Sequence, residues 1–109
     1  MYIVLLITIK EITMEFKIDG ITLYTCDKYG NKGRKIADNT SFASFDESRN
    51  IFIVTDLDGI VQTRDEYGNP IRKICENAIE ARFVDKDIIV RTRNGNEQRD
   101  EYGNLIRKI

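Results

Sequence analysis

A five-residue motif occurs three times in this chain of 109 residues. It reads Asp-Glu-Tyr-Gly-Asn at residues 65–69 and 100–104, and Asp-Lys-Tyr-Gly-Asn at residues 27–31. Each copy is followed closely by Arg-Lys-Ile. A repeat of this period indicates that one small unit is built three times and that the units stack, since a single unit cannot bury its own apolar face.

Each motif predicts a β-hairpin turn. In the second copy, Asp65 can accept hydrogen bonds from backbone N–H groups of the turn. Gly68 can adopt the positive φ that closes a type I turn into a bulge. Residues 60–64 and 71–74 on either side favour strands. Turn geometry therefore explains the aspartate and the glycine. It does not require the tyrosine, which we expect near the exposed tip.

The repeats predict an all-β fold of one domain. Aligning them divides the chain into repeats 1–36, 37–74 and 75–109, each with about four short antiparallel strands. No long segment has helical periodicity, so we expect almost no helix. The apolar run Met1–Ile9 is expected to be a buried first strand. Alternatively, Met14 is the natural start and residues 1–13 precede it.

The first residues also bear on location. Met1–Ile9 is too short to span a bilayer, and it lacks the basic region and cleavage site of a secretory signal. We therefore expect no membrane segment and a cytoplasmic protein. Cys26 and Cys75 are far apart in the sequence and have no metal-ligand spacing, so we expect reduced structural thiols.

The order of strands and turns in a repeat resembles the blades of β-propellers. The second repeat has the apolar strand Ile51–Val54, the pair Asp58-Gly59 and the turn Asp65–Gly68. Blades of the pyrroloquinoline-quinone-enzyme and NHL types have a similar order. The resemblance covers most of the chain and implies a propeller-blade-like meander. The tryptophan of the quinone-enzyme blade is missing, with Arg72 or Arg107 nearby instead, so no cofactor is inferred. The turns are also similar to the tyrosine-aspartate repeats of bacterial Rhs-type shells, which recur at a shorter period.

Three blades do not close a ring, because propellers typically have about 4–8 blades. Two chains could supply six, so we expect a homo-oligomer and favour a dimer. A β-trefoil, a β-prism, and an open meander or barrel remain alternatives. In an open sheet the last strand, residues 105–109, would be an exposed edge that invites pairing with another chain.

Composition excludes several functions. The chain has no histidine, which removes the usual general base, the serine triad and the commonest zinc ligand. Its carboxylate pairs recur with the turns, which indicates turn chemistry rather than catalysis or a metal site. The net charge is −1, with acidic and basic residues interspersed, so no nucleic-acid footprint is evident. We therefore predict no enzyme, no cofactor, no metal and no nucleic-acid partner.

Two functions remain. In the first, the turns present tyrosines and asparagines to a glycan or protein, because aromatic stacking and amide hydrogen bonds together suit sugar binding. The candidate ligand-binding residues are Tyr29, Asn31, Tyr67, Asn69, Tyr102 and Asn104. In the second, the chain is a structural or assembly protein that self-associates and has no small-molecule ligand.

Overall fold

The computed structural model describes residues 14–109, which form eleven β-strands and no helix. The predicted all-β class is therefore confirmed, whereas the predicted strand Met1–Ile9 lies outside the described residues. The first sheet contains β1 (Glu15–Asp19), β2 (Thr22–Cys26) and β3 (Lys32–Ala37). The second contains β4 (Thr40–Asp46), β5 (Ile51–Asp56), β6 (Val61–Asp65) and β7 (Pro70–Cys75). The third contains β8 (Ala78–Val84), β9 (Asp87–Thr92), β10 (Gly95–Arg99) and β11 (Leu105–Lys108).

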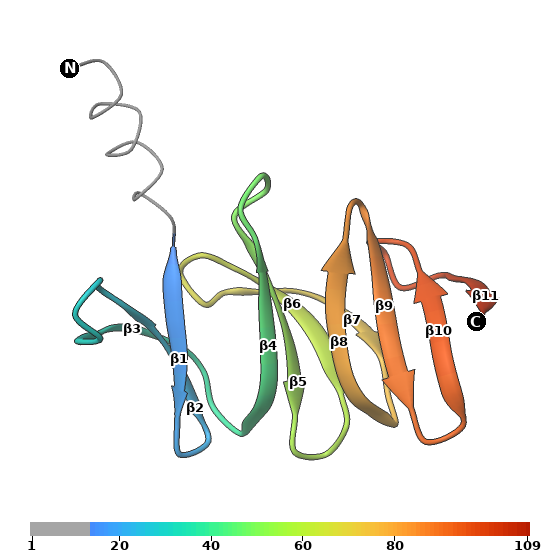
Figure 1. The fold of residues 1–109 in the computed structure, drawn as a ribbon, viewed down its shortest axis with the longest axis horizontal. Helices are drawn as coiled ribbons and strands as arrows, with labels where there is room; N and C mark the ends of the chain where they lie inside the picture. Colours follow the sequence, from blue (N-terminus) through green and yellow to red (C-terminus); the bar gives the residue numbers. More distant parts are fainter. Residues whose placement is uncertain (1–13) are drawn as a thin grey trace.

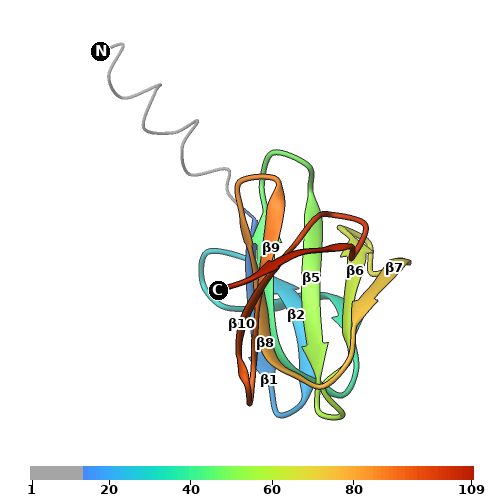
Figure 2. The ribbon, with the colours of Figure 1, turned by 90° about the vertical axis from the view of Figure 1, so that its right-hand side faces the viewer.

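Each sheet is an antiparallel meander whose neighbouring strands are also neighbours in sequence. The three sheets lie side by side along the long axis of the molecule, which measures 51 × 29 × 21 Å (Figure 1). A view turned by 90° shows the sheets one behind another (Figure 2). The prediction of about four strands holds for the second and third sheets. The first sheet has three strands within residues 14–109.

Sharp connections place the sheets face to face. Only residues 38–39 separate β3 from β4, and only residues 76–77 separate β7 from β8. Asn39 and Asn77 have φ angles of 52° and 60°, in the left-handed region that asparagine tolerates better than most residues. The Ala78 N–H then donates to the Gly59 carbonyl at 2.9 Å, which joins the start of the third sheet to a hairpin of the second.

Strand β5 lies at the centre of the hydrophobic core. Side chains alternate between the faces of a strand, and here both faces are covered. Phe52 and Val54 belong to the cluster between the first and second sheets, the first junction. Ile53 belongs to the cluster between the second and third sheets, the second junction. Phe52 also packs edge-on against Phe16, with ring centroids 5.5 Å apart.

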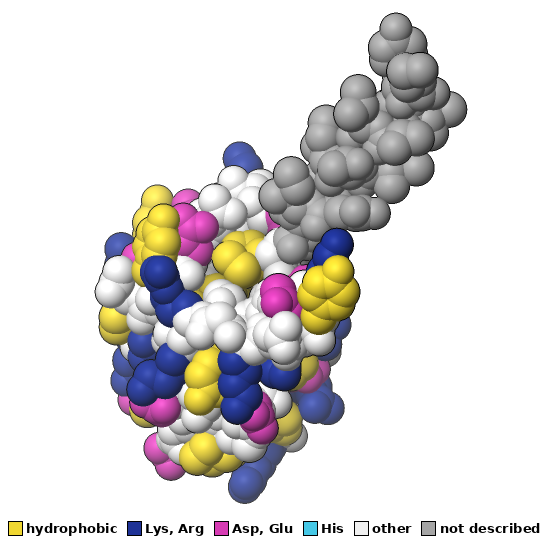
Figure 3. Space-filling view, turned by 90° about the vertical axis from the view of Figure 1, so that its left-hand side faces the viewer, with side chains coloured by type: hydrophobic (Ala, Val, Ile, Leu, Met, Phe, Trp, Pro, Cys, Tyr) yellow, Lys and Arg dark blue, Asp and Glu magenta, His cyan; other side chains and the backbone are white. Residues whose placement is uncertain are grey.

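The outward faces of the first and third sheets are polar. On the third sheet, Arg91 lies 3.3 Å from Glu80, and Arg82 lies 3.1 Å from the same carboxylate. On the first sheet, Asp19 pairs with Lys32. Figure 3 views that end of the row and shows acidic and basic side chains interspersed with a few hydrophobic ones. The apolar core is thus confined to the two internal junctions.

Candidate functional site

The three Tyr-Gly-Asn turns have the same internal hydrogen bonds. In the second turn, the backbone N–H groups of Tyr67 and Asn69 both donate to Asp65 Oδ1 at 2.9 Å. Asp27 and Asp100 accept the equivalent bonds at the same distance. The prediction that the aspartate accepts backbone hydrogen bonds is confirmed. These bonds lie within the five residues of each motif, so the local sequence specifies the hydrogen bonding of the turn.

The asparagine of each turn also bonds to its aspartate. The Nδ2 groups of Asn69 and Asn104 donate to Asp65 and Asp100 at 3.0 Å, and Asn31 does the same to Asp27 at 3.1 Å. These are three of the six residues that we predicted to bind a ligand. Each amide already uses one of its two N–H groups inside the turn, so one N–H and the carbonyl oxygen of each side chain remain for a further contact.

Hydrogen bonding also sets the charge of the turns. The backbone N–H of Asn69 is the main cause that lowers the pKa of Asp65, and Asn31 does the same for Asp27. For Asp100, the side-chain amide of Asn104 lowers the pKa most. Donors to a carboxylate favour its charged form. The three aspartates are therefore ionised at neutral pH and already hold several donors each.

Two of the predicted tyrosines lie against the preceding sheet. The guanidinium of Arg34 in β3 lies 4.8 Å from the ring centre of Tyr67, and that of Arg72 in β7 lies 5.1 Å from that of Tyr102. These distances allow cation–π attraction. Within residues 14–109, the one cation over the ring of Tyr29 is that of its neighbour Lys28. Tyr29 is 78% exposed, compared with 57% for each of the other two.

The glycine of the turn approaches the same preceding strand. Gly68 and Gly103 both have a φ of 92°. A Cβ atom added to Gly68 would lie 2.9 Å from the Ile36 carbonyl oxygen, and one on Gly103 would lie 2.7 Å from that of Ile74. A Cβ on Gly30 would have no neighbour within 4 Å. The last two turns therefore need glycine for φ and for close packing, whereas the first needs it for φ alone.

The isoleucines of the three Arg-Lys-Ile segments differ in burial. Ile36 and Ile74 are 3% and 6% exposed, whereas Ile109 is 64% exposed. We call the tyrosine and glycine of a turn the Tyr-Gly pair. We call the arginine and isoleucine of an Arg-Lys-Ile segment, in the last strand of a sheet or directly after it, the Arg/Ile site. Each of the two junctions contains one Tyr-Gly pair packed on one Arg/Ile site. Sequence reasoning missed this role of the arginines, although Arg-Lys-Ile follows every copy of the motif.

A cation fixes the carbonyl oxygen of each turn glycine. Arg64 Nη1 donates to Gly68 at 2.7 Å, and Arg99 Nη1 donates to Gly103 at 2.7 Å. In the first sheet, Lys17 Nζ donates to the Gly30 carbonyl at 2.5 Å. Three turns of equal shape are thus held by equivalent bonds, and only two of them contact another sheet.

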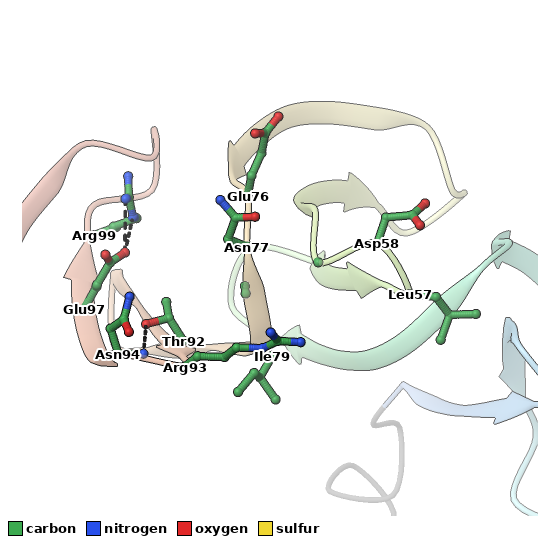
Figure 4. A pocket seen from close by; sticks show the side chains of 12 residues that line it. Leu57, Asp58, Glu76, Asn77, Ile79, Thr92, Arg93, Asn94, Glu97 and Arg99 are labelled. Atoms are coloured by element: carbon green, nitrogen blue, oxygen red, sulfur yellow. Dashed lines mark hydrogen bonds and ion pairs between the residues drawn. The ribbon is translucent and has the colours of Figure 1, made fainter.

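A separate hollow of about 700 Å³ lies between hairpin ends of the second and third sheets (Figure 4). Its charged lining residues are Asp58, Glu76, Arg93, Glu97 and Arg99. Glu97 and Arg99 pair with each other at 3.0 Å. None of the six predicted ligand-binding residues lines this hollow, and its lining has no aromatic ring on which a sugar could stack. The hollow therefore does not match the predicted chemistry.

Other chemistry has little support in the described part of the chain. Residues 14–109 contain no cluster of three or more histidine, cysteine, aspartate or glutamate side chains that could hold a metal ion. Within the same range, no helix is long and apolar enough to cross a membrane. Cys26 and Cys75 are not bonded to each other, and burial raises the pKa of the Cys75 thiol. No protein-family model matches this chain, and no curated protein matches it in sequence.

Proposed function

We propose that this protein is a non-catalytic structural and assembly module, in which the Tyr-Gly-Asn turns fasten one β-sheet to the next. One observation carries the proposal: the same contact is made at both junctions. Tyr67 and Gly68 pack on Arg34 and Ile36 in the first junction. In the second junction, Tyr102 and Gly103 pack in the same way on the Arg72 and Ile74 site.

This function accounts for more residues than ligand binding does. A glycan-binding role would explain the tyrosine and the asparagine of each turn. It would leave unexplained why a guanidinium covers the ring of Tyr67 and why its neighbour Gly68 touches backbone. A fastening role explains the tyrosine, the glycine, the arginine and the isoleucine together, and the asparagine follows from its bond to the turn aspartate.

The blade-like arrangement belongs to the same proposal. Meander sheets packed face to face, with the last strand of one sheet connected directly to the first strand of the next, are what propeller blades require. The short connections at residues 38–39 and 76–77 support this arrangement. So does the double-sided core around β5, because an internal blade must bury both of its faces.

Substituting the tyrosines tests the proposed function. Tyr67→Ser and Tyr102→Ser each remove a stacked ring, so each should lower the free energy of unfolding by about 1 kcal/mol. Tyr29→Ser is the matched control, since its turn is the same and its ring contacts no other sheet. It should change stability by less than about 0.5 kcal/mol. Urea unfolding followed by far-UV circular dichroism measures all three.

A glycan array with the same variants distinguishes the two functions. Absence of glycan binding by the wild type, together with destabilised Tyr67 and Tyr102 variants, supports the fastening role. The opposite result would be specific glycan binding that Tyr67→Ser and Tyr102→Ser abolish while the unfolding curve stays unchanged. That result would make the turns a ligand-binding rim and contradict the proposal.

A further inference from the structure

At each end of the row of sheets, one half of the junction contact has no counterpart within residues 14–109. The Tyr-Gly pair Tyr29-Gly30 packs on no Arg/Ile site within residues 14–109, and the Arg/Ile site of Arg107 and Ile109 receives no Tyr-Gly pair. We propose that a second copy of this chain docks head to tail, with Tyr29 and Gly30 of one copy on Arg107 and Ile109 of the other. This inference rests on the proposed fastening role of the turns.

The unoccupied Arg/Ile site is already in place. The Ile109 N–H donates to the Asn96 carbonyl at 2.9 Å, which fixes the end of the chain on β10. Arg107 Nε donates to Gln98 Oε1 at 2.7 Å, so the guanidinium is held beside its own sheet. Ile109 is 64% exposed, whereas its two counterparts are almost fully buried in the core clusters of the two junctions. A docked turn would cover an isoleucine that is otherwise left in water.

The unoccupied Tyr-Gly pair is equally well formed. Its aspartate, Asp27, makes the same bonds as the aspartates of the two packed turns, and Lys17 holds the Gly30 carbonyl. The space beside Gly30 is open, where the other two glycines touch a carbonyl oxygen. Because both halves are ordered before they meet, docking would cost little conformational entropy.

The contact between copies would differ from the internal junctions in one respect. Its surroundings are charged, since the outward face of the third sheet carries Glu80 and Arg91, and that of the first carries the Asp19–Lys32 pair. An apolar core such as that around Phe52 would be absent. Association should therefore be weaker than internal packing and dependent on concentration. A contact between two different surfaces closes into a ring or extends as an open row.

Two variants test the proposal, each with one of the two halves of the contact removed. Wild-type mass, measured by size-exclusion chromatography with light scattering, should rise with concentration above the 12.7 kDa of one chain. Tyr29→Ser and Ile109→Asp should each remain monomeric alone. Their equimolar mixture should give a two-chain complex and nothing larger, because one intact half of the contact survives on each partner. Arg107→Ser is a second variant of the Arg/Ile site and should behave like Ile109→Asp.

The control is Ile106→Asp, in β11, three residues before Ile109. Ile106 is 50% exposed, and so is its counterpart Ile71, whose strand lies in an occupied junction. This position therefore takes no part in the contact, and the variant should associate like the wild type. A wild type that stays monomeric at every concentration, or a mixture that does not pair, would overturn head-to-tail docking. If the Tyr67 and Tyr102 variants were nevertheless destabilised, the internal fastening role would still be supported.

Discussion

The first Tyr-Gly-Asn turn has the same internal hydrogen bonds as the two later ones but differs from them in its contacts with other sheets. In each, the aspartate accepts the same backbone bonds at 2.9 Å. Of the three turn tyrosines, Tyr67 and Tyr102 lie under an arginine of another sheet, whereas Tyr29 is largely exposed. The comparison teaches that aspartate, glycine and asparagine specify the shape of the turn. What the tyrosine does depends on whether a sheet precedes it.

The largest difference in stability is expected between substituting the isoleucine of an occupied Arg/Ile site and substituting that of the unoccupied site. Ile74→Ala removes a buried side chain from the second junction and should lower the free energy of unfolding by about 2–5 kcal/mol. Ile109→Ala removes an exposed one and should change it by less than about 0.5 kcal/mol. Urea unfolding at a concentration where the chain is monomeric gives both values. Equal losses would mean that Ile109 is packed in the isolated chain, and the comparison would fail.

The next largest difference in stability is expected between substituting the glycine of a packed turn and substituting that of the first turn. Gly103→Ala places a side chain at a positive φ, which costs about 1–2 kcal/mol, and against the Ile74 carbonyl, which costs about 1–3 kcal/mol more. Gly30→Ala incurs the first cost alone, because its surroundings are open. Thermal unfolding by circular dichroism should therefore rank Gly103→Ala well below Gly30→Ala. Identical melting temperatures would show that the backbone of the second junction relaxes around the new methyl group.

Much of the fold could be predicted from short-range patterns. The alternation of apolar residues and the Asp-Gly and Tyr-Gly-Asn signals locate every strand of the second and third sheets. The ends of the strands were harder to predict. Strand β4, for example, begins at Thr40, whose N–H donates to the Ile21 carbonyl in the β1–β2 turn of the first sheet at 2.7 Å. A backbone bond between sheets leaves no trace in hydrophobic periodicity.

The candidate site was harder still to predict. The pairing of Arg34 with Tyr67 joins side chains from two sheets, and no local rule connects them. The repeat was the one available clue, since Arg-Lys-Ile recurs with the motif in every copy. The bond between Asn69 and Asp65, in contrast, is local and follows from turn chemistry. Sequence reasoning could therefore identify the residues of the turn, but not the arginine of another sheet that lies over the tyrosine ring.

A smaller loss of stability is expected when the turn aspartate is substituted, and it should be the same in the first turn as in a packed turn. Asp27→Ala and Asp65→Ala each remove an acceptor of two backbone bonds, and each should lower the melting temperature by a few degrees to the same extent. The equality matters because these bonds are internal to the turn. A much larger loss for Asp65→Ala would show that the junction depends on the exact shape of its turn, so that local and long-range terms are coupled.

The smallest effect is expected in the dependence of stability on pH. The pKa values of Asp27, Asp65 and Asp100 are lowered in the folded chain. Their contribution is thus complete above the ordinary aspartate pKa of about 3.9 and is lost as the pH falls through the lower folded-state values. Urea midpoints measured from neutral pH downward should fall in the wild type below about pH 5. They should fall less steeply in Asp27→Ala and in Asp65→Ala, because each variant lacks one carboxylate whose pKa is lowered mainly by hydrogen bonds from its own turn. If the urea midpoint of Asp65→Ala alone depended less steeply on pH, Arg34 or another charge of the junction would be interacting with the Asp65 carboxylate. The turns would then not be electrostatically independent of the sheets that they fasten.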